Sequence, residues 1–208
     1  MPKKTLLIPF IIALNILVFF MWNTNFVSEN FMQENFLVSW QALQEGRFWT
    51  LLGSAFSHNS FMHILVNMFV LNSFGPLLAQ VLGKKLFISF YMAAAALSSL
   101  CHAVVSNLLL HSPDLPALGA SGAIAGLVLL FALIFPKERL LFFGFIPVPA
   151  LVGALGFIAL DLWGLFAQAE GGGLPIGHGA HLGGSFTGIL FYFLFVRKKV
   201  RRHIDMNI

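Results

Sequence analysis

The stretch GASGAIAG, residues 119–126, places a serine among small residues inside a long apolar part of the chain. Of the 208 residues, 58% are hydrophobic and only 10% are charged, and 24 are phenylalanine. This composition lies outside the range of soluble domains. Ser121 is therefore expected inside a membrane, where polar side chains are costly and usually face the protein interior for a functional reason.

Six apolar stretches have the length of a membrane-spanning helix. They lie at about residues 5–22, 61–82, 86–110, 118–135, 140–166 and 179–196. The sequence thus predicts an all-α polytopic membrane protein, with one domain over residues 1–208 forming a bundle of six transmembrane helices. The outer connection 23–60 is rich in aromatic residues, so we expect short amphipathic helices in it rather than disorder.

The basic residues predict the orientation of the chain. They stand before the first span, in alternate connections and after the last span: Lys3, Lys4, Lys84, Lys85, Lys137, Arg139, Arg197, Lys198, Lys199, Arg201 and Arg202. Only Arg47 falls on the opposite side if the spans alternate. By the positive-inside rule both termini are cytoplasmic. The net charge of +4 is therefore a topology signal, and no nucleic-acid partner is expected.

Three polar residues on different predicted helices share one depth. Counting back from the basic residues that follow each helix places Ser121, His181 and Asn67 roughly 24–26 Å above the cytoplasmic side. His63 lies one helical turn above Asn67 on the same face. In an apolar core about 30 Å thick, this level is inside the membrane but near its outer face.

The fourth helix is predicted to begin close to Ser121, because Pro113 and Pro116 precede it. Such a helix is too short to cross the bilayer fully. Non-helical backbone at membrane depth is tolerated only where it is buried in protein or lines a water-filled cavity. We therefore expect water to reach Ser121 from the outer side, next to the free N–H groups of a helix N-terminus.

This group of residues is suited to acyl transfer. A neutral imidazole such as His181 can accept the proton of the Ser121 hydroxyl. The Asn67 amide, the His63 imidazole and the backbone N–H of Ser121 can stabilise the oxyanion. Asp161, counted from Arg139, lies near the outer end of the fifth helix and receives no role. With no acid expected at this level, the interpretation is a Ser–His dyad.

The same residues have ordinary explanations as well. Gly122 with Gly126, and Gly184 with Gly188, have a spacing that is common where membrane helices simply pack closely. Such packing of the fourth and sixth helices would also bring Ser121 to His181.

The remaining histidines receive no catalytic role. We expect His102 to be a satisfied interior polar group, and His178 and His203 to be solvated. Metal binding fits poorly, because His63, His102 and His181 are not joined by a carboxylate. Neither a metal nor another cofactor is expected.

Four motifs, in this order along the chain, resemble those of the rhomboid family of intramembrane serine proteases. RFWTLL at 47–52 resembles the Arg/Trp motif of the first loop, HNSFMHILVNM the second-helix signature, GASGAIAG the nucleophile motif and GAHLGG the motif of the last helix. The resemblance makes Ser121 the nucleophile and His181 the general base, and places His63 and Asn67 in the oxyanion hole. It gives supporting positions to Arg47, Trp49, Gly119, Gly122 and Gly184.

The chain departs from the family pattern at two places. Ala125 stands where many members carry an aromatic residue that stacks on the catalytic imidazole. Ala79 and Gln80 stand where many carry a glutamate near the end of the second helix. Both departures concern how His181 is oriented.

The resemblance implies hydrolysis of peptide bonds in or near the transmembrane segments of other membrane proteins, without an obligatory partner subunit. A substrate helix would enter between the second and fifth helices, beneath a lid formed by the loop AQAEGGGLPIG. The alternative is a non-catalytic membrane protein that binds transmembrane helices. A small transporter is disfavoured by the lack of paired intramembrane charges or a two-fold repeat. The expected location is a bacterial inner membrane, with the site open to the outer side.

Overall fold

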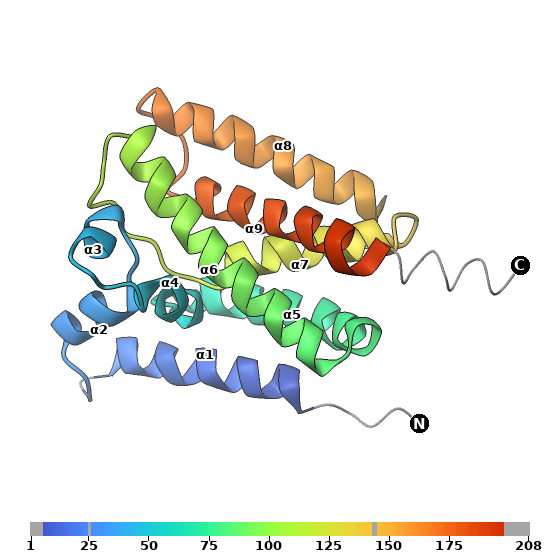
Figure 1. Cartoon of the computed structure of the whole chain (residues 1–208), viewed down its shortest axis with the longest axis horizontal. Helices are drawn as coiled ribbons and strands as arrows, with labels where there is room; N and C mark the ends of the chain where they lie inside the picture. The colour runs from blue at the N-terminus through green and yellow to red at the C-terminus, as the bar shows by residue number, and fades with distance from the viewer. Residues whose placement is uncertain (1–5, 25, 143–144, 198–208) are drawn as a thin grey trace, which may run out of the picture.

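The structure, a computed structural model, describes residues 6–24, 26–142 and 145–197, and long helices dominate it (Figure 1). The basic residues Lys3, Lys4, Lys198, Lys199, Arg201 and Arg202, and also His203, lie outside the described residues. The main helices run in chain order as α1 (Leu7–Asn23), α5 (Phe61–Leu82), α6 (Lys84–Leu108), α7 (Ser121–Ile134), α8 (Ala150–Ala169) and α9 (His178–Phe191). A π-helical segment, η2 (Tyr192–Val196), continues α9.

Among the described residues, α5, α6, α8 and the continuous segment His178–Val196 are long and apolar enough to cross a membrane, while α1 and α7 are apolar but shorter. The outside of the bundle carries large apolar side chains. On α8 alone, Leu155, Leu160, Trp163 and Phe166 are all more than half exposed. Such a surface fits lipid contact rather than water. The predicted polytopic helical membrane fold is confirmed, and the number of six spans stays a prediction.

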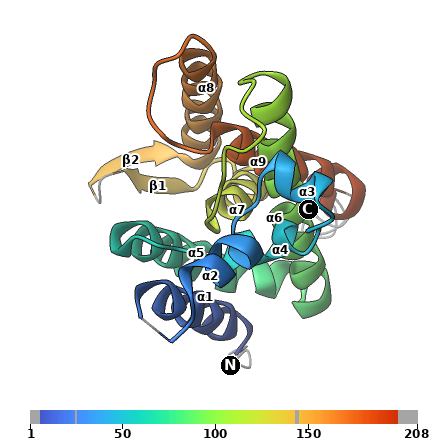
Figure 2. The ribbon, with the colours of Figure 1, turned by 90° about the vertical axis from the view of Figure 1, so that its left-hand side faces the viewer.

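Helix α7 lies at the centre of the bundle, with α5, α6, α8 and α9 around it (Figure 2). Its apolar side chains point in every direction, and Leu127 and Leu130 have no exposed surface. A helix that is apolar all round is expected to be buried. Its 14 residues span only about 21 Å, less than the thickness of a bilayer core. The prediction of a short helix that begins at Ser121 is confirmed.

Helices α7 and α9 meet along a glycine seam formed by Gly122, Gly126, Gly184 and Gly188. A Cβ atom added at Gly184 would overlap the carbonyl oxygen of Gly122. One added at Gly188 would collide with the carbonyl oxygen of Gly126. The two backbones are therefore in direct contact, which only residues without side chains permit.

The outer connection folds as expected into short helices, which gather at one end of the bundle in Figure 1: α2 (Glu29–Phe36), α3 (Trp40–Gln44), α4 (Thr50–Gly53) and the 3-10 turn η1 (Ser54–Phe56). The Ser28 and Ser39 side chains cap α2 and α3 by accepting hydrogen bonds from backbone N–H groups. Serine is favoured at this position because its oxygen satisfies a free donor of the first turn.

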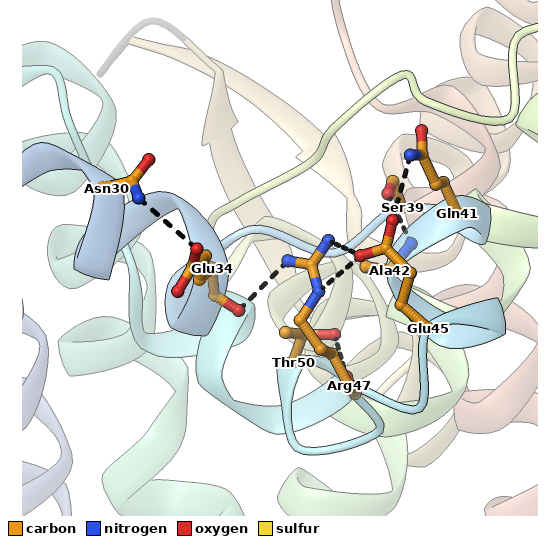
Figure 3. A network of polar contacts seen from close by, with 8 residues as sticks. All are labelled: Asn30, Glu34, Ser39, Gln41, Ala42, Glu45, Arg47 and Thr50. Atoms are coloured by element: carbon orange, nitrogen blue, oxygen red, sulfur yellow. Dashed lines mark hydrogen bonds and ion pairs between the residues drawn. The ribbon is translucent and has the colours of Figure 1, made fainter.

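Arg47 holds this outer segment together (Figure 3). Its guanidinium donates to Glu45 Oε2 at 2.6 and 3.0 Å and to the carbonyl of Glu34 at 3.2 Å. The hydrogen bond from Arg47 lowers the pKa of the Glu45 carboxyl. Trp49 lies nearby and is 55% exposed. Both residues thus belong to the outer segment and not to the surroundings of Ser121.

The predicted fifth span, 140–166, is wrong at its start. β1 (Arg139–Phe142) and β2 (Ile146–Pro149) form an antiparallel hairpin in which Arg139 pairs with Pro149. Helix α8 begins only at Ala150. Apolar content alone does not distinguish a strand from a helix, and Pro147 and Pro149 both disfavour helix before Ala150. The predicted bounds of the other five spans agree closely with α1, α5, α6, α7 and the His178–Val196 segment.

Candidate active site

Ser121 is the first residue of α7, and its Oγ lies 3.0 Å from Nε2 of His181 on α9. Both side chains are half-buried. The glycine seam begins one residue after Ser121, so the close contact of the two helices fixes the distance between the two side chains. At this length and pairing, the hydroxyl can donate its proton to the imidazole.

The turn before Ser121 requires a glycine. Gly119 has φ +122°, a conformation that L side chains rarely adopt, and a Cβ there would overlap the His63 ring. Its N–H donates to the carbonyl of Ser54 at 2.8 Å, and the next N–H, that of Ala120, donates to His58 Nε2 at 3.4 Å. These contacts set the direction in which α7 and the Ser121 hydroxyl begin.

His58, which sequence reasoning gave no role, is fully buried beside this turn. Burial, with a smaller effect from His63, lowers the pKa of His58 to about 3. The ring is therefore neutral near neutral pH and keeps a free acceptor for the Ala120 N–H.

His63 and Asn67 lie one turn apart on α5 and line the same cavity as Ser121. The Asn67 amide donates one of its two N–H groups to the carbonyl of His63 at 2.9 Å. The amide carries a second N–H donor, and Asn67 lines the cavity. The predicted oxyanion residues and Ser121 thus line one cavity, and the role of these residues stays a prediction.

The prediction that no acid lies at this level is wrong, and the dyad interpretation, which rested on it, stays a prediction. Asp161 on α8 is buried, and its Oδ1 lies 3.0 Å from Nδ1 of His181. The cause is the β1–β2 hairpin, because a count from Arg139 treats its residues as part of the helix, which begins only at Ala150. Counted from Ala150, Asp161 lies about 16 Å along the axis of α8. Ser121 lies roughly 20 Å along α7 from the C-terminal end of that helix, so the two residues have a similar depth.

His178 was expected to be solvated, and this prediction is wrong as well. It is 7% exposed, and its Nδ1 lies 2.7 Å from the same Asp161 Oδ1. The ring packs against Gly164, where a Cβ would overlap it. Among the described residues, no hydrogen-bond partner reaches its Nε2. The i, i+3 spacing of the two histidines in HGAH would have revealed their proximity if the helix had been taken to begin one residue earlier.

Asp161, His178 and His181 offer three ligand atoms within 4.8 Å of one another. Tetrahedral zinc ligands at 2.0–2.1 Å from the ion lie about 3.3 Å apart. The two N–O distances here, 2.7 and 3.0 Å, are instead those of hydrogen bonds between an imidazole N–H and a carboxylate. The geometry is that of a hydrogen-bonded network, and the absence of a metal stays a prediction.

A cavity of about 830 Å³ contains the serine, as predicted, and extends towards α2 and the outer loops. On one side it is closed by the connection between α8 and α9, through Pro175, Ile176 and Gly177. The Gln168 side chain donates to the carbonyls of Leu174 and Ile176 at 2.7 and 2.8 Å. These hydrogen bonds fix the connection between α8 and α9 at the cavity, and its role as a lid stays a prediction.

His102 is a satisfied interior group, as predicted. It is buried, and its Nε2 lies 3.1 Å from the carbonyl of Leu115 and 3.3 Å from Ser106 Oγ. It therefore anchors the segment that leads to α7.

Comparison with known proteins gives one family and several relatives. The sequence pattern of the Rhomboid domain matches residues 45–198. Rhomboid protein 1, mitochondrial, of Saccharomyces cerevisiae is 40% identical over 157 residues, 74% of this chain and 43% of that protein. RHOMBOID-like protein 12, mitochondrial, of Arabidopsis thaliana is 33% identical over 180 residues, 81% of this chain and 52% of that protein.

A human relative extends the comparison. The Presenilin-associated rhomboid-like protein, mitochondrial, of Homo sapiens is 31% identical over 189 residues, 87% of this chain and 46% of that protein. The chain spans about half the length of the relatives that it matches.

Proposed function

The chain belongs to the rhomboid family, and on this premise we propose that it is an intramembrane serine endopeptidase with a Ser–His–Asp triad. The observation that carries the proposal is the continuous chain of hydrogen bonds from Ser121 through His181 to Asp161. Three helices contribute one residue each at a similar depth, and two of these residues, Ser121 and His181, line one cavity.

In the proposed reaction, His181 Nε2 takes the proton of Ser121 while Oγ attacks the carbonyl carbon of the scissile peptide bond. The negative charge that forms on the carbonyl oxygen is stabilised by the Ser121 N–H, with Asn67 and His63 as further donors. His181 then gives its proton to the leaving amine. A water molecule from the cavity then attacks the acyl carbon while His181 takes its proton, and the bond to Ser121 Oγ breaks as His181 returns that proton to Oγ.

Asp161 has two tasks in this scheme. Its carboxylate accepts from Nδ1, so that the neutral His181 ring presents a bare Nε2 to Ser121, and it stabilises the imidazolium that forms during the reaction. Rhomboids that carry an aromatic residue at the position of Ala125 stack it on the imidazole. We infer that Asp161 orients the ring in this chain, where Ala125 offers no such surface.

The proposed substrates are transmembrane segments of other membrane proteins. The family acts on such segments, and α8 exposes an apolar surface beside the cavity, next to the proposed entry between α5 and α8. Release of the Gln168 hydrogen bonds would let the lid open for the substrate.

The protein is an integral membrane protein, and we propose a single rhomboid domain over residues 1–208 with both termini on the side of the basic residues. The three relatives described above are named as mitochondrial, which favours a mitochondrial membrane over the bacterial inner membrane expected from sequence. In either membrane the site would open on the side opposite to the basic residues.

The direct test is labelling of the detergent-solubilised full chain with a fluorophosphonate probe, which reacts with activated serines. We expect labelling of wild type and none of Ser121→Ala or His181→Ala, with the helical circular dichroism unchanged in all three. Folded wild type that does not label would contradict the proposal and favour a membrane protein that binds transmembrane helices without cleaving them.

A further inference from the structure

One carboxylate oxygen serves two imidazoles. Asp161 Oδ1 lies 2.7 Å from Nδ1 of His178 and 3.0 Å from Nδ1 of His181. The contact to the histidine outside the proposed triad is thus the shorter of the two. Both histidines stand on the first turn of α9, three residues apart.

His178 is held tightly in this position. Its ring is buried against Gly164 of α8, and the next residue, Gly179, packs against Val105 of α6. Because Nδ1 contacts a carboxylate, it carries the proton of the neutral ring, and Nε2 is then bare. That nitrogen is buried without a partner among the described residues, an arrangement that costs free energy. A residue that served only to fill space would not need this orientation.

We propose that His178 is a positioning residue for the catalytic base: it fixes the Asp161 carboxylate against His181 and shares the acceptor strength of that carboxylate with it. The inference rests on the proposed function, since it concerns the same reaction. His178 is not among the residues that line the cavity, so it would act through its contact with Asp161.

Two effects follow from the loss of the His178 N–H. A hydrogen bond to a carboxylate stabilises its negative charge. Without this bond, Asp161 attracts the N–H of His181 more strongly and favours its imidazolium form, so that a higher pH is needed to free the base. The carboxylate also becomes free to rotate, which lowers the rate even when the base is deprotonated.

The other titratable groups near the two histidines come from the remaining helices around α9. They are His102 and Cys101 on α6, which lie close to Gly177 and Gly183, and His63 on α5, which faces His181. Among the described residues, none of them forms a hydrogen bond or ion pair with the Asp161 carboxylate, whose partners are His178 and His181.

The experiment measures the rate of fluorophosphonate labelling of the full chain from about pH 5 to pH 9. For His178→Leu we expect the acid-side midpoint of the profile to rise by about one pH unit. The maximal rate should fall about tenfold. His178→Asn, whose amide N–H can occupy the place of Nδ1–H, should restore both values most of the way to wild type.

Two glycine variants test the same idea without touching a histidine. Gly164→Ala inserts a methyl group where the His178 ring lies, and should shift the midpoint in the same direction. Gly156→Ala is the matched control on α8, because a Cβ there meets nothing within 4 Å. Its profile should be that of wild type.

The outcomes separate the two proposals. If wild type labels and Ser121→Ala does not, but folded His178→Leu and Gly164→Ala keep the wild-type midpoint or lower it, the positioning role is wrong. If His178→Leu does not fold, the difference between Gly164→Ala and Gly156→Ala decides the question. Failure of wild type itself to label would instead contradict the proposed protease activity.

Discussion

Helix α9 contacts its two neighbours in different ways. Towards α7 it presents the glycine seam, where carbonyl oxygens lie at the places that side chains would occupy. Towards α8 the contact rests on polar groups, with Asp161 bound to His178 and His181. Only five α8 residues are buried: Ala150, Gly153, Ala154, Asp161 and Gly164.

Two distances in the site are therefore fixed by different kinds of contact. The distance from Ser121 to His181 is fixed by backbone packing, which tolerates no added atom. The distance from His181 to Asp161 depends on hydrogen bonds, which can break and form again. A helix held in the second way can shift without changing the distance between Ser121 and His181, which fits the proposed substrate path beside α8.

The largest effect should come from breaking the polar contact. Asp161→Asn keeps the size of the side chain but removes the charge and favours the wrong tautomer of His181. The labelling rate should fall about 10³–10⁴-fold, with little change in thermal stability because the seam is untouched. A fall of less than tenfold would mean that Asp161 only packs, and that the site works as a dyad.

Breaking the seam should reduce the rate less but cost more stability. In Gly184→Ala the new methyl group overlaps the Gly122 carbonyl, so the helices must separate by a fraction of an ångström or more. Overpacking of this kind costs about 1–3 kcal/mol. The shift between Ser121 and His181 should slow labelling about 10²-fold. Thermal unfolding in detergent and the labelling rate measure the two effects, and Gly156→Ala is again the control. Equal melting temperatures for the two variants would show that the seam can relax.

His58, which is buried beside the turn that starts α7, should make the stability of the fold sensitive to acid. Because His58 has a folded pKa of about 3 against an ordinary value of 6.5, its proton binds more readily to the unfolded chain. The contribution of this group is complete above about pH 6.5 and is lost as the pH falls towards about 3, by about 1.4 kcal/mol per pH unit. Unfolding temperatures measured from about pH 7 to pH 4 should therefore decline more steeply in wild type than in His58→Gln. Parallel curves would exclude His58 as the cause.

The smallest effect should come from the lid. Gln168→Ala removes two hydrogen bonds that hold the connection between α8 and α9, at some distance from the reacting atoms. Each such bond contributes about 1 kcal/mol, so labelling should become several-fold faster at most, with an unchanged pH profile. Slower labelling would show that Gln168 supports the closed site rather than gating it.

The sequence predicts the positions of Ser121 and His181, which the glycine seam brings together, but not the contact between His181 and Asp161. Ser121, His181, His63 and Asn67 lie on helices whose ends are marked by basic residues or prolines, so counting along the chain gave their common depth. Asp161 was misplaced because an apolar hairpin has the same composition as a membrane helix. Pro147 and Pro149 carried the missing signal, since a helix that starts after them puts Asp161 at the level of Ser121.

The contacts of His178 were beyond sequence reasoning for another reason. They depend on how α8 and α9 are rotated about their axes, and the small side chain that makes room for the ring, Gly164, comes from a different helix. Periodicity on one helix does not report such a rotation when the outside of the bundle is as apolar as its inside.

Because of the hairpin of β1 and β2, the number of residues between α7 and α8 does not determine where Asp161 lies in the site. Residues inserted between the two strands would lengthen a projecting ribbon and leave α8 in register, so an epitope tag at that point should be compatible with activity. A single residue inserted between Ala150 and Asp161 would instead turn the carboxylate by about 100° and raise it by about 1.5 Å. For this protein, the tolerance to insertion changes abruptly within a few residues of Pro149.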